Sequence, residues 1–332
     1  MQNFWGKLKK PIFALAPMED VTDCAFREIF ARYGKPALAS PRRDGPDVMF
    51  TEFVNVDGLC HEEGRKKFEI DLKYTENQRP IVAQLWGRDP EKFRQAAEII
   101  AGMKFDGIDI NMGCPKDREV KLKTCAALIK EPQLAQYIIK RTREGAGGLP
   151  VSVKTRIGYN GNEISEWLPK LLEVQPAVVS IHARSKKDKS KVPARWEIIK
   201  EAVQIRNQLQ SKTLIIGNGD IKSRQEGLQR IEQTGCDGVI IGRGAFGNPW
   251  IFRKDNCQPS SKQKLQAMLE HAKLFNQVFG TAKPFVEMRK FFKAYASGFE
   301  GAHELRAKLM QAEDYPETEK LVKNFLRHHN LE

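Results

Sequence analysis

The chain of 332 residues lacks long hydrophobic runs and paired-cysteine motifs. No apolar stretch reaches the roughly 18–20 residues that a membrane span needs, and the opening segment MQNFWGKLKK has no apolar signal-peptide core. We therefore expect a cytoplasmic protein without membrane contact. A chain of this length needs no disulfide staples, so we expect free thiols at its six scattered cysteines: Cys24, Cys60, Cys114, Cys125, Cys236 and Cys257.

Two further absences narrow the possible functions. Histidine, cysteine and carboxylate residues nowhere show the spacing of metal ligands, so we predict no metal site. There is also no low-complexity segment, and no internal repeat beyond an alternation of strand-like and helix-like stretches.

What the chain has in excess is positive charge. Lysine and arginine number 55 against 42 aspartate and glutamate residues, which gives a net charge of +13 and a pI near 9.4. Such a balance favours a polyanionic partner, because lysine and arginine displace counterions from phosphates. Charge alone does not distinguish RNA from a membrane surface, and a merely basic enzyme stays an alternative.

Eight short apolar, β-branched runs predict buried strands, and helical patterns separate most of them. Eight strands that alternate with helices favour a closed α/β sheet, the (β/α)₈ or TIM barrel, ending near Phe252. The predicted strands are 11–16, 48–53, 81–85, 107–110, 151–155, 178–181, 214–216 and 238–241.

After about Ser261 the pattern becomes wholly helical. Helices are expected at 265–279, 285–296, 302–312 and 318–328, with glycine and proline residues between them. These stretches predict a small helical bundle rather than another strand–helix unit.

Polar groups follow most of the predicted strands, and in a barrel all such ends share one face. Glycine-rich turns Gly217-Asn-Gly-Asp220 and Gly242-Arg-Gly244 close the last two strands, where barrels commonly bind phosphate. Lys154 and Gln84 are expected at the same mouth, where they suit an electron-rich ring. Tight structural turns are the alternative explanation of the glycines.

The stretch 107–115 (GIDINMGCP) ends a strand in an amide, a thiol and a glycine-proline turn. Such a strand end is a candidate reactive site, with Asn111 and Cys114 as its reactive groups. A lone cysteine after a turn is more often structural, so the case depends on the other strand ends.

Together these motifs resemble the tRNA-dihydrouridine synthase family. The resemblance runs from about residue 11 into the helical tail, and is carried by 16–23 (APMEDVTD), 111–115 (NMGCP), 153–156 (VKTR), 182–184 (HAR), 217–220 (GNGD), 235–250 (GCDGVIIGRGAFGNPW) and 288–295 (MRKFFKAY). It implies an FMN-binding barrel over residues 1–255 and a helical RNA-binding domain over 256–332. It also implies that the protein is a flavin-dependent oxidoreductase that reduces the uridine C5=C6 bond in tRNA with NADPH.

The resemblance also implies roles for single residues. Cys114 would be the general acid that protonates uracil C5, and Asn111 would hold the uracil. Arg184 would lie near flavin or RNA. The residues expected to bind FMN are Pro17, Met18, Gln84, Lys154, His182, Asn218, Gly219, Asp220, Gly242 and Arg243. Because a thiol acid must keep its proton, we expect an undepressed pKa and no cation directly on Cys114.

The chain departs from the family pattern at three places. Where the family usually has a glycine-rich run after the cysteine, residues 120–128 read VKLKTCAAL. Cys125 is there a second thiol, which we interpret as a small apolar side chain at a helix start. Residues 35–44 look like an insertion with Arg42 and Arg43, expected away from the site. Arg195 stands before Trp196 where the family more often has an acidic residue.

Two loops carry much of the excess positive charge and would rim the site, where they are candidates to hold RNA backbone. Their basic residues are Lys116, Arg118, Lys121, Lys123, Lys186, Lys187, Lys189 and Lys191. The helical tail is only modestly basic, so its RNA role depends on the resemblance. A target base must leave its stack to enter a barrel, which suits a uridine in a loop.

The sequence favours an FMN-dependent reductase of tRNA uridines, with ribosomal RNA as a possible substrate, acting as a monomer. One alternative is an FMN barrel oxidoreductase for a small pyrimidine or enone. Another is an RNA-binding homologue without catalysis.

Overall fold

The computed structural model describes residues 3–34, 44–255 and 258–329. Eight parallel strands form one sheet in the order β1-β8-β7-β6-β5-β4-β3-β2. Their bounds are β1 Ile12–Leu15, β2 Met49–Asn55, β3 Ile81–Trp86, β4 Gly107–Met112, β5 Val151–Arg156, β6 Val178–His182, β7 Leu214–Asn218 and β8 Gly238–Ile241.

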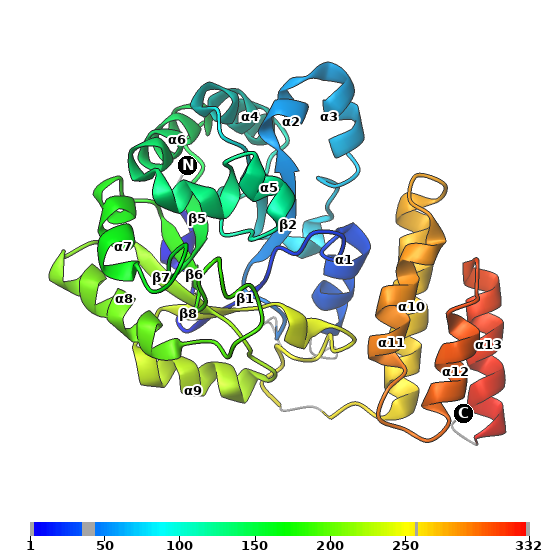
Figure 1. Ribbon diagram of the computed structural model, residues 1–332. Coiled ribbons are helices and arrows are strands. Elements are labelled where there is room, and N and C mark those ends of the chain that lie inside the picture. Colours follow the sequence, from blue (N-terminus) through cyan, green and yellow to red (C-terminus); the bar gives the residue numbers. More distant parts are fainter. Residues whose placement is uncertain (1–2, 35–43, 256–257, 330–332) are drawn as a thin grey trace.

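The two edges of this sheet meet. Ala14 of β1 pairs with Val48 just before β2, and the Leu15 N–H donates to the Val48 carbonyl at 3.0 Å. The Phe13 carbonyl in turn accepts from the Asp47 N–H at 2.7 Å. These bonds close the sheet, so the predicted (β/α)₈ barrel is confirmed (Figure 1).

Alternation along each strand divides the core in two, because successive side chains of a strand point to opposite faces. In β1 and its end, Ile12, Ala14 and Ala16 join a core inside the barrel, while Phe13 and Leu15 pack outward among the helices. Toward the carboxyl ends of the strands, the side chains that point into the barrel change from apolar to polar. The next inward residue after Val82 is Gln84, and the next after Ile216 is Asn218. The barrel is therefore filled below and polar at its mouth.

Helices surround the strands (Figure 1). Asp23 caps α1 by accepting from the Phe26 N–H. Helices α2, α3 and α5 were not predicted from the sequence; they are 5 to 7 residues long, too short for a clear helical period. The helices before the tail are α1 Cys24–Tyr33, α2 Val56–Cys60, α3 Glu62–Phe68, α4 Pro90–Gly102, α5 Asp117–Lys121, α6 Pro132–Gly145, α7 Ile164–Glu173, α8 Trp196–Gln208 and α9 Arg224–Thr234, with short 3₁₀ turns η1 Phe4–Lys7, η2 Glu76–Gln78, η3 Cys125–Lys130 and η4 Arg243–Ala245.

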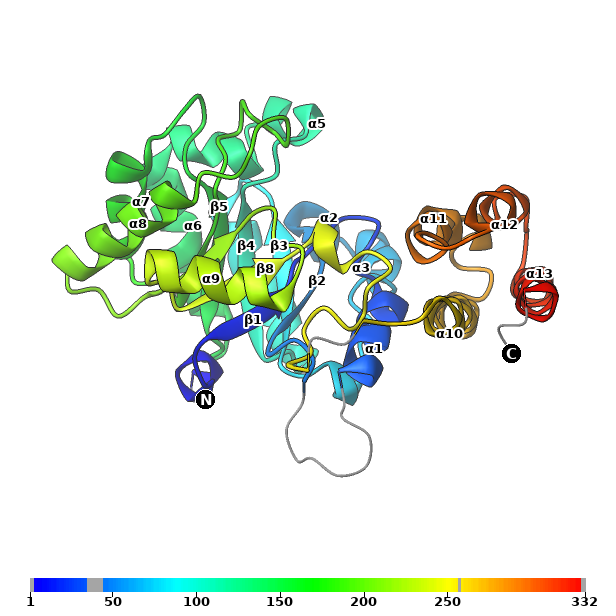
Figure 2. The ribbon, with the colours of Figure 1, turned by 90° about the horizontal axis from the view of Figure 1, so that it is seen from below.

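The tail consists of helices only, as predicted from the sequence. Figure 2 shows α10 and α11 facing the barrel, with α12 and α13 behind them. The contact with α1 combines a tilted ring pair, Phe26 with Phe291 at 5.4 Å between centroids, and an ion pair from Arg32 to Glu270 at 2.8 Å. The tail elements are α10 Ser261–Phe279, η5 Phe285–Met288, α11 Arg289–Tyr295, α12 Ala302–Leu309 and α13 Tyr315–His328.

Several predicted boundaries are wrong by a few residues. Strand β4 runs on through Asn111 to Met112, where the sequence suggested an end at Ile110, because β5 continues to pair with it. Pro316 lies in the first turn of α13 instead of before it, a position that proline tolerates. In the described part of the chain no helix is long and apolar enough to cross a membrane.

Two expectations concern residues outside the described ranges. Cys257 is one of them; the other five cysteines are free thiols, as predicted. Most of the expected insertion, including Arg42 and Arg43, is also outside these ranges.

Candidate active site

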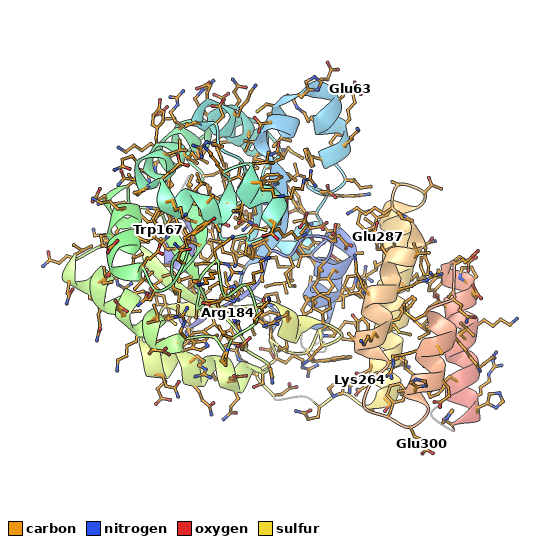
Figure 3. The ribbon with its side chains drawn as sticks, viewed as in Figure 1. Glu63, Trp167, Arg184, Lys264, Glu287 and Glu300 are labelled. Atoms are coloured by element: carbon orange, nitrogen blue, oxygen red, sulfur yellow. The ribbon has the colours of Figure 1, made fainter. Side chains whose placement is uncertain are left out.

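A cavity of about 1090 Å³ opens at the carboxyl ends of β1, β5, β6, β7 and β8. Arg184, in the loop after β6, lies near the centre of the barrel in Figure 3. Ten residues singled out from the sequence line this one cavity: Pro17, Met18, Lys154, His182, Arg184, Asn218, Gly219, Asp220, Gly242 and Arg243.

Positive charge dominates the lining of the cavity. Five cationic side chains, Lys154, Arg184, Lys191, Lys222 and Arg243, stand against the two carboxylates Asp220 and Glu226. Asp220 binds two of the cations, Arg184 at 2.5 Å and Arg243 at 2.7 Å. The remaining excess suits a ligand that carries a phosphate.

Lys154 extends from β5 into the lining of the cavity. Burial, assisted by the neighbouring Arg156, lowers its pKa to about 8, although Asp109 and Cys114 oppose the change. Its Nζ donates to Asn218 Oδ1 at 3.4 Å, and Asn218 is itself fixed by a bond from Nδ2 to the Ile240 carbonyl. Lys154 therefore remains mostly protonated at neutral pH in a defined position.

His182 is neutral at physiological pH. Burial lowers its pKa well below the ordinary value, and the nearby cations Arg156, Lys154, Arg184 and Arg243 reinforce this effect. Arg184 Nη1 lies 3.2 Å from His182 Nε2, and a guanidinium can only donate. Nε2 is thus the acceptor, and the ring proton is on Nδ1. His182 can donate a hydrogen bond to a ligand but is a poor acid.

The loop after β7 presents its backbone to the cavity. Gly219 has φ of +141°, and a Cβ there would come within 2.7 Å of the Ala194 Cβ. Trp196 supports the loop by donating from Nε1 to the Gly219 carbonyl at 3.1 Å. Because no side chain fits at 219, the backbone itself lines the cavity, as phosphate-binding loops require.

Beside the cavity, the turn after β4 carries Cys114. Asn111 Oδ1 accepts hydrogen bonds from the N–H groups of Gly113 at 3.0 Å and Cys114 at 2.9 Å. Arg156 holds the same turn from β5, donating from Nε to the Gly113 carbonyl at 2.7 Å. The position of the thiol is therefore set by two buried side chains, Asn111 and Arg156.

A ladder of buried polar side chains lies behind this turn. Asn111 Nδ2 donates to Gln84 Oε1 at 3.0 Å, and Gln84 Nε2 donates to Asp109 Oδ2 at 2.6 Å. Asp109 Oδ1 accepts from Ser152 Oγ at 2.6 Å. The Asp109 carboxylate sets the orientation of the Gln84 amide, and Gln84 in turn sets the orientation of the Asn111 amide. The ladder therefore determines that the oxygen of Asn111 faces the Cys114 N–H.

Cys114 has a second thiol as its neighbour. A hydrogen bond from Cys125 lowers the pKa of Cys114; burial opposes this change, and the Lys116 N–H assists it. The pKa of Cys125 is raised well above the ordinary thiol value by Cys114 and by burial. The expected undepressed pKa of Cys114 is thus wrong, because Cys125, interpreted from the sequence only as a small apolar side chain, is a neighbour that influences it.

The basic loops meet at the rim. Lys189 pairs with Asp117 of α5 at 3.2 Å, and Lys186 lies 5.0 Å from the ring of Tyr159. Lys191 reaches the cavity, and Lys187 is exposed. The ion pair joins the loops after β4 and β6 into one edge of the site, the basic edge, which consists of residues 116–123 and 186–191.

The structure places most, but not all, of the predicted site residues at the cavity. Gln84, Asn111 and Cys114 lie outside its lining; Gln84 is fully buried, with its amide engaged in the ladder. Arg184 is only 2% exposed and donates to Val192, His182 and Asp220, so it braces the site. Sequence reasoning missed the supporting residues Asp109 and Arg156, although both stand two positions from a predicted site residue and so on the same face of their strands.

A parallel barrel with its cavity at the strand carboxyl ends defines a class of proteins that bind ligands at this face. Within this class the chain belongs to the dihydrouridine synthase family: the family described as "Dihydrouridine synthase (Dus)" matches residues 14–330.

Two curated relatives resemble nearly the whole chain. A probable tRNA-dihydrouridine synthase of Staphylococcus aureus (strain COL) is 42% identical over 326 residues, covering 98% of this chain and 96% of the relative. The probable tRNA-dihydrouridine synthase 2 of Bacillus subtilis (strain 168) is 42% identical over 328 residues, covering 98% and 97%. Among solved structures, histamine dehydrogenase from Rhizobium sp. 4-9 matches with a TM-score of 0.53 and 12% identity, over 79% of this chain and 48% of that one; the likeness concerns the fold alone.

Proposed function

We propose that this protein reduces uridines of tRNA to 5,6-dihydrouridine, with FMN in the strand-end cavity and NADPH as the source of electrons. The observation that carries the proposal is the position of Cys114, an oriented thiol beside a cationic cavity in a member of the dihydrouridine synthase family. The names of the two relatives support tRNA as the substrate.

The cavity residues fit FMN. The bare backbone at Gly219 and the guanidinium of Arg243 would take the phosphate, while Lys154 and His182 would face the ring. When bound, FMN supplies the hydride that reduces uracil C6. The protein has to hold this group, exclude water and deliver a proton to the other carbon.

Cys114 is the proposed proton donor. Its S–H bond breaks as a C–H bond forms at uracil C5, and the electron pair of the S–H bond stays on sulfur. Asn111 uses one N–H of its amide for Gln84 and keeps the second for the uracil. A pKa lowered toward the working pH makes the thiol a better acid, provided that it still holds its proton.

The basic edge and the helical tail are the proposed RNA-binding surfaces, so that residues 1–255 perform the chemistry and 256–332 help to bind RNA. Lys191 is exposed at the cavity and Lys187 is exposed in the same loop, where they would reach phosphates next to a flipped uridine. We place the reaction in the cytoplasm; the expected monomer stays a prediction.

Purified protein tests the proposal directly. Incubated with NADPH and an unmodified tRNA transcript, it should show a flavin spectrum and convert uridine to dihydrouridine, detected in digested RNA by mass spectrometry. Activity on free uridine with none on tRNA would favour the small-pyrimidine alternative. A colourless protein that gains nothing from added FMN would favour an RNA-binding homologue without catalysis. Conversion of ribosomal RNA alone would replace the substrate and keep the chemistry.

A further inference from the structure

A second cavity, of about 350 Å³, lies at the seam between the barrel and the helical tail, and we call it the seam cavity. One wall is formed by residues that follow β7 and β8, and the other by residues of α10, α11 and the turns next to them. Lys222 and Gly244 line both the seam cavity and the larger strand-end cavity proposed for FMN. The two cavities are therefore direct neighbours.

The seam cavity gathers positive charge. The described residues of its lining include no carboxylate but four cationic side chains: Lys222, Arg224, Arg253 and Lys264. Arg253 pairs with Asp255, which is outside the lining, and Arg224 donates to the Phe252 carbonyl at 3.1 Å. Within the described parts of the chain, Lys222 and Lys264 belong to no ion pair. Cations gathered without a counter-ion repel one another, so this cavity is suited to an anion.

The tail contributes one of these two amines. Lys264 lies in the first turns of α10, the tail helix that lies next to the barrel (Figure 3). Its Nζ stands beside Gly298, 4.0 Å from the position of a Cβ there. Two aromatic residues, Phe246 and Trp250, line the same cavity. Amines next to aromatic rings suit a phosphate joined to a nucleoside, because the rings offer an apolar surface to the base.

We propose that the seam cavity binds the adenosine 2′-phosphate end of NADPH, with Lys222 and Lys264 on the 2′-phosphate, while the nicotinamide end reaches the strand-end cavity. The inference rests on the proposed function, in which NADPH supplies the electrons. Because NADH lacks the 2′-phosphate, these two lysines would select NADPH over NADH.

The charge of the site favours this ligand over the backbone of RNA. A terminal phosphate carries close to two negative charges at neutral pH, whereas each phosphodiester carries one, so two lysines without ion-pair partners match the terminal group. The basic edge proposed for RNA follows β4 and β6, whereas the seam cavity follows β7 and β8. Binding of RNA backbone in the seam cavity is therefore the competing outcome of the test.

Two probes isolate the 2′-phosphate: adenosine 2′,5′-bisphosphate carries it, and adenosine 5′-monophosphate does not. In calorimetric titrations of the FMN-bound protein, the bisphosphate should bind about 10-fold more tightly or better, the scale of a charge-assisted hydrogen bond. Lys264→Gln should remove most of this difference and leave the affinity for the monophosphate unchanged. Lys262→Gln, two positions earlier on α10 and outside the cavity lining, is the matched control and should bind both probes like wild type.

Flavin reduction tests the intact donor. In Lys264→Gln the Kd for NADPH, taken from the concentration dependence of flavin reduction, should rise by about 10-fold, while that for NADH and that for tRNA stay at their wild-type values. Equal affinities of the wild type for the two probes would overturn the proposal, as would equal weakening of NADPH and NADH by Lys264→Gln.

Weaker binding of tRNA with unchanged binding of NADPH would also overturn the proposal, because the seam cavity would then hold RNA backbone. The proposed function fails separately. Wild-type protein that binds the bisphosphate and prefers NADPH through Lys264, yet forms no dihydrouridine in tRNA, would refute the proposed function and leave the 2′-phosphate site in place.

Discussion

The two halves of the strand-end ring use different chemistry. After β6, β7 and β8 the side chains are charged: the buried Arg184 and the exposed Arg243 both pair with Asp220 at the cavity. On β3 and β4 the side chains Gln84 and Asn111 are neutral amides, buried behind the thiol. The first arrangement suits a charged ligand, whereas the second orients the turn that carries Cys114 through buried amides.

This difference bears on why Cys114, the proposed acid, lies on the amide side. A thiol placed among the arginines of the cavity would lose its proton, since neighbouring cations depress thiol pKa values strongly. Next to Cys125 and a backbone N–H, the pKa of Cys114 is lowered by neutral donors. We expect substitutions on the charged half to reduce binding of the cofactor, and those on the amide half to reduce proton transfer or folding.

The largest expected effect is that of Cys114→Ala. Dihydrouridine formation should fall by roughly 10²-fold or more, the scale for loss of a positioned general acid. The fold and the flavin content should persist, because the residue lies on a turn and contributes little to the core. Steady-state assays with tRNA and the flavin spectrum measure both. The buried thiol Cys236, which lies just before β8 and donates to the Gly238 carbonyl, supplies a matched control, and Cys236→Ala should leave the activity near wild type.

A second test breaks the charged half. Arg243→Ala removes an exposed guanidinium that is tied to Asp220, and should weaken FMN binding by roughly 10-fold or more, as expected for a lost charge-assisted hydrogen bond. Titration of apoprotein with FMN gives the affinity. Arg94→Ala, on the outer helix α4, is the matched control and should bind FMN normally. Equal affinities for the two variants would place the phosphate elsewhere.

The basic edge should contribute to RNA affinity in a salt-dependent way. Replacing Lys186, Lys187, Lys189 and Lys191 by glutamine should weaken tRNA binding and flatten the plot of log affinity against log salt, by up to about 0.7 for each lost contact to a single strand. Lys66 and Lys67 on α3 are a control pair of exposed lysines in another part of the barrel. An unchanged slope would move the RNA surface away from this edge.

The smallest effect concerns the buried ladder. Burial raises the pKa of Asp109 to about 6, although hydrogen bonds from Ser152 and Gln84 oppose this change. Between the ordinary pKa of 3.8 and about 6, the folded protein therefore holds a proton that the unfolded chain has released. The contribution of this group to stability is therefore full at low pH and is lost as the pH rises through 6. Between pH 5 and 8 the free energy of unfolding of wild type, relative to Asp109→Asn, should fall by roughly 1 to 2 kcal/mol.

Urea unfolding of both proteins at the two pH values measures this difference. Glu144→Gln, on the surface of α6, corrects for the general effect of removing a carboxylate. A difference between wild type and Asp109→Asn that is constant from pH 5 to 8 would show that Asp109 is ionised in the folded protein over the whole range.

The sequence predicted much of the fold, because local patterns encode it. Apolar runs such as Val239–Ile241 depend only on neighbouring residues, and the eight strands followed from such signals. The ring of polar strand ends also followed, since a parallel barrel gathers them on one face. Helix α3 was not predicted because it has no buried residue and therefore no periodic pattern of apolar residues.

Pairwise contacts across the barrel were not predictable in the same way. Nothing in the spacing shows that Asp109 bonds to Gln84, 25 residues earlier, or that Arg156 holds the Gly113 carbonyl. Cys125 was interpreted as a filler because its left-handed φ and its contact with Cys114 depend on how the segment after α5 folds back. Such features arise from tertiary packing.

One measurement tests the division between the two halves most directly: anaerobic stopped-flow absorbance of the flavin in wild type, Cys114→Ala and FMN-reconstituted Arg243→Ala. Reduction by NADPH and reoxidation by tRNA are followed separately. The account predicts that Cys114→Ala is reduced at the wild-type rate and reoxidised by tRNA roughly 10²-fold more slowly. Arg243→Ala, once saturated with FMN, should be reoxidised by tRNA at close to the wild-type rate. Reoxidation of Cys114→Ala by tRNA at the wild-type rate would contradict the assignment of the acid and with it the separation of the two halves.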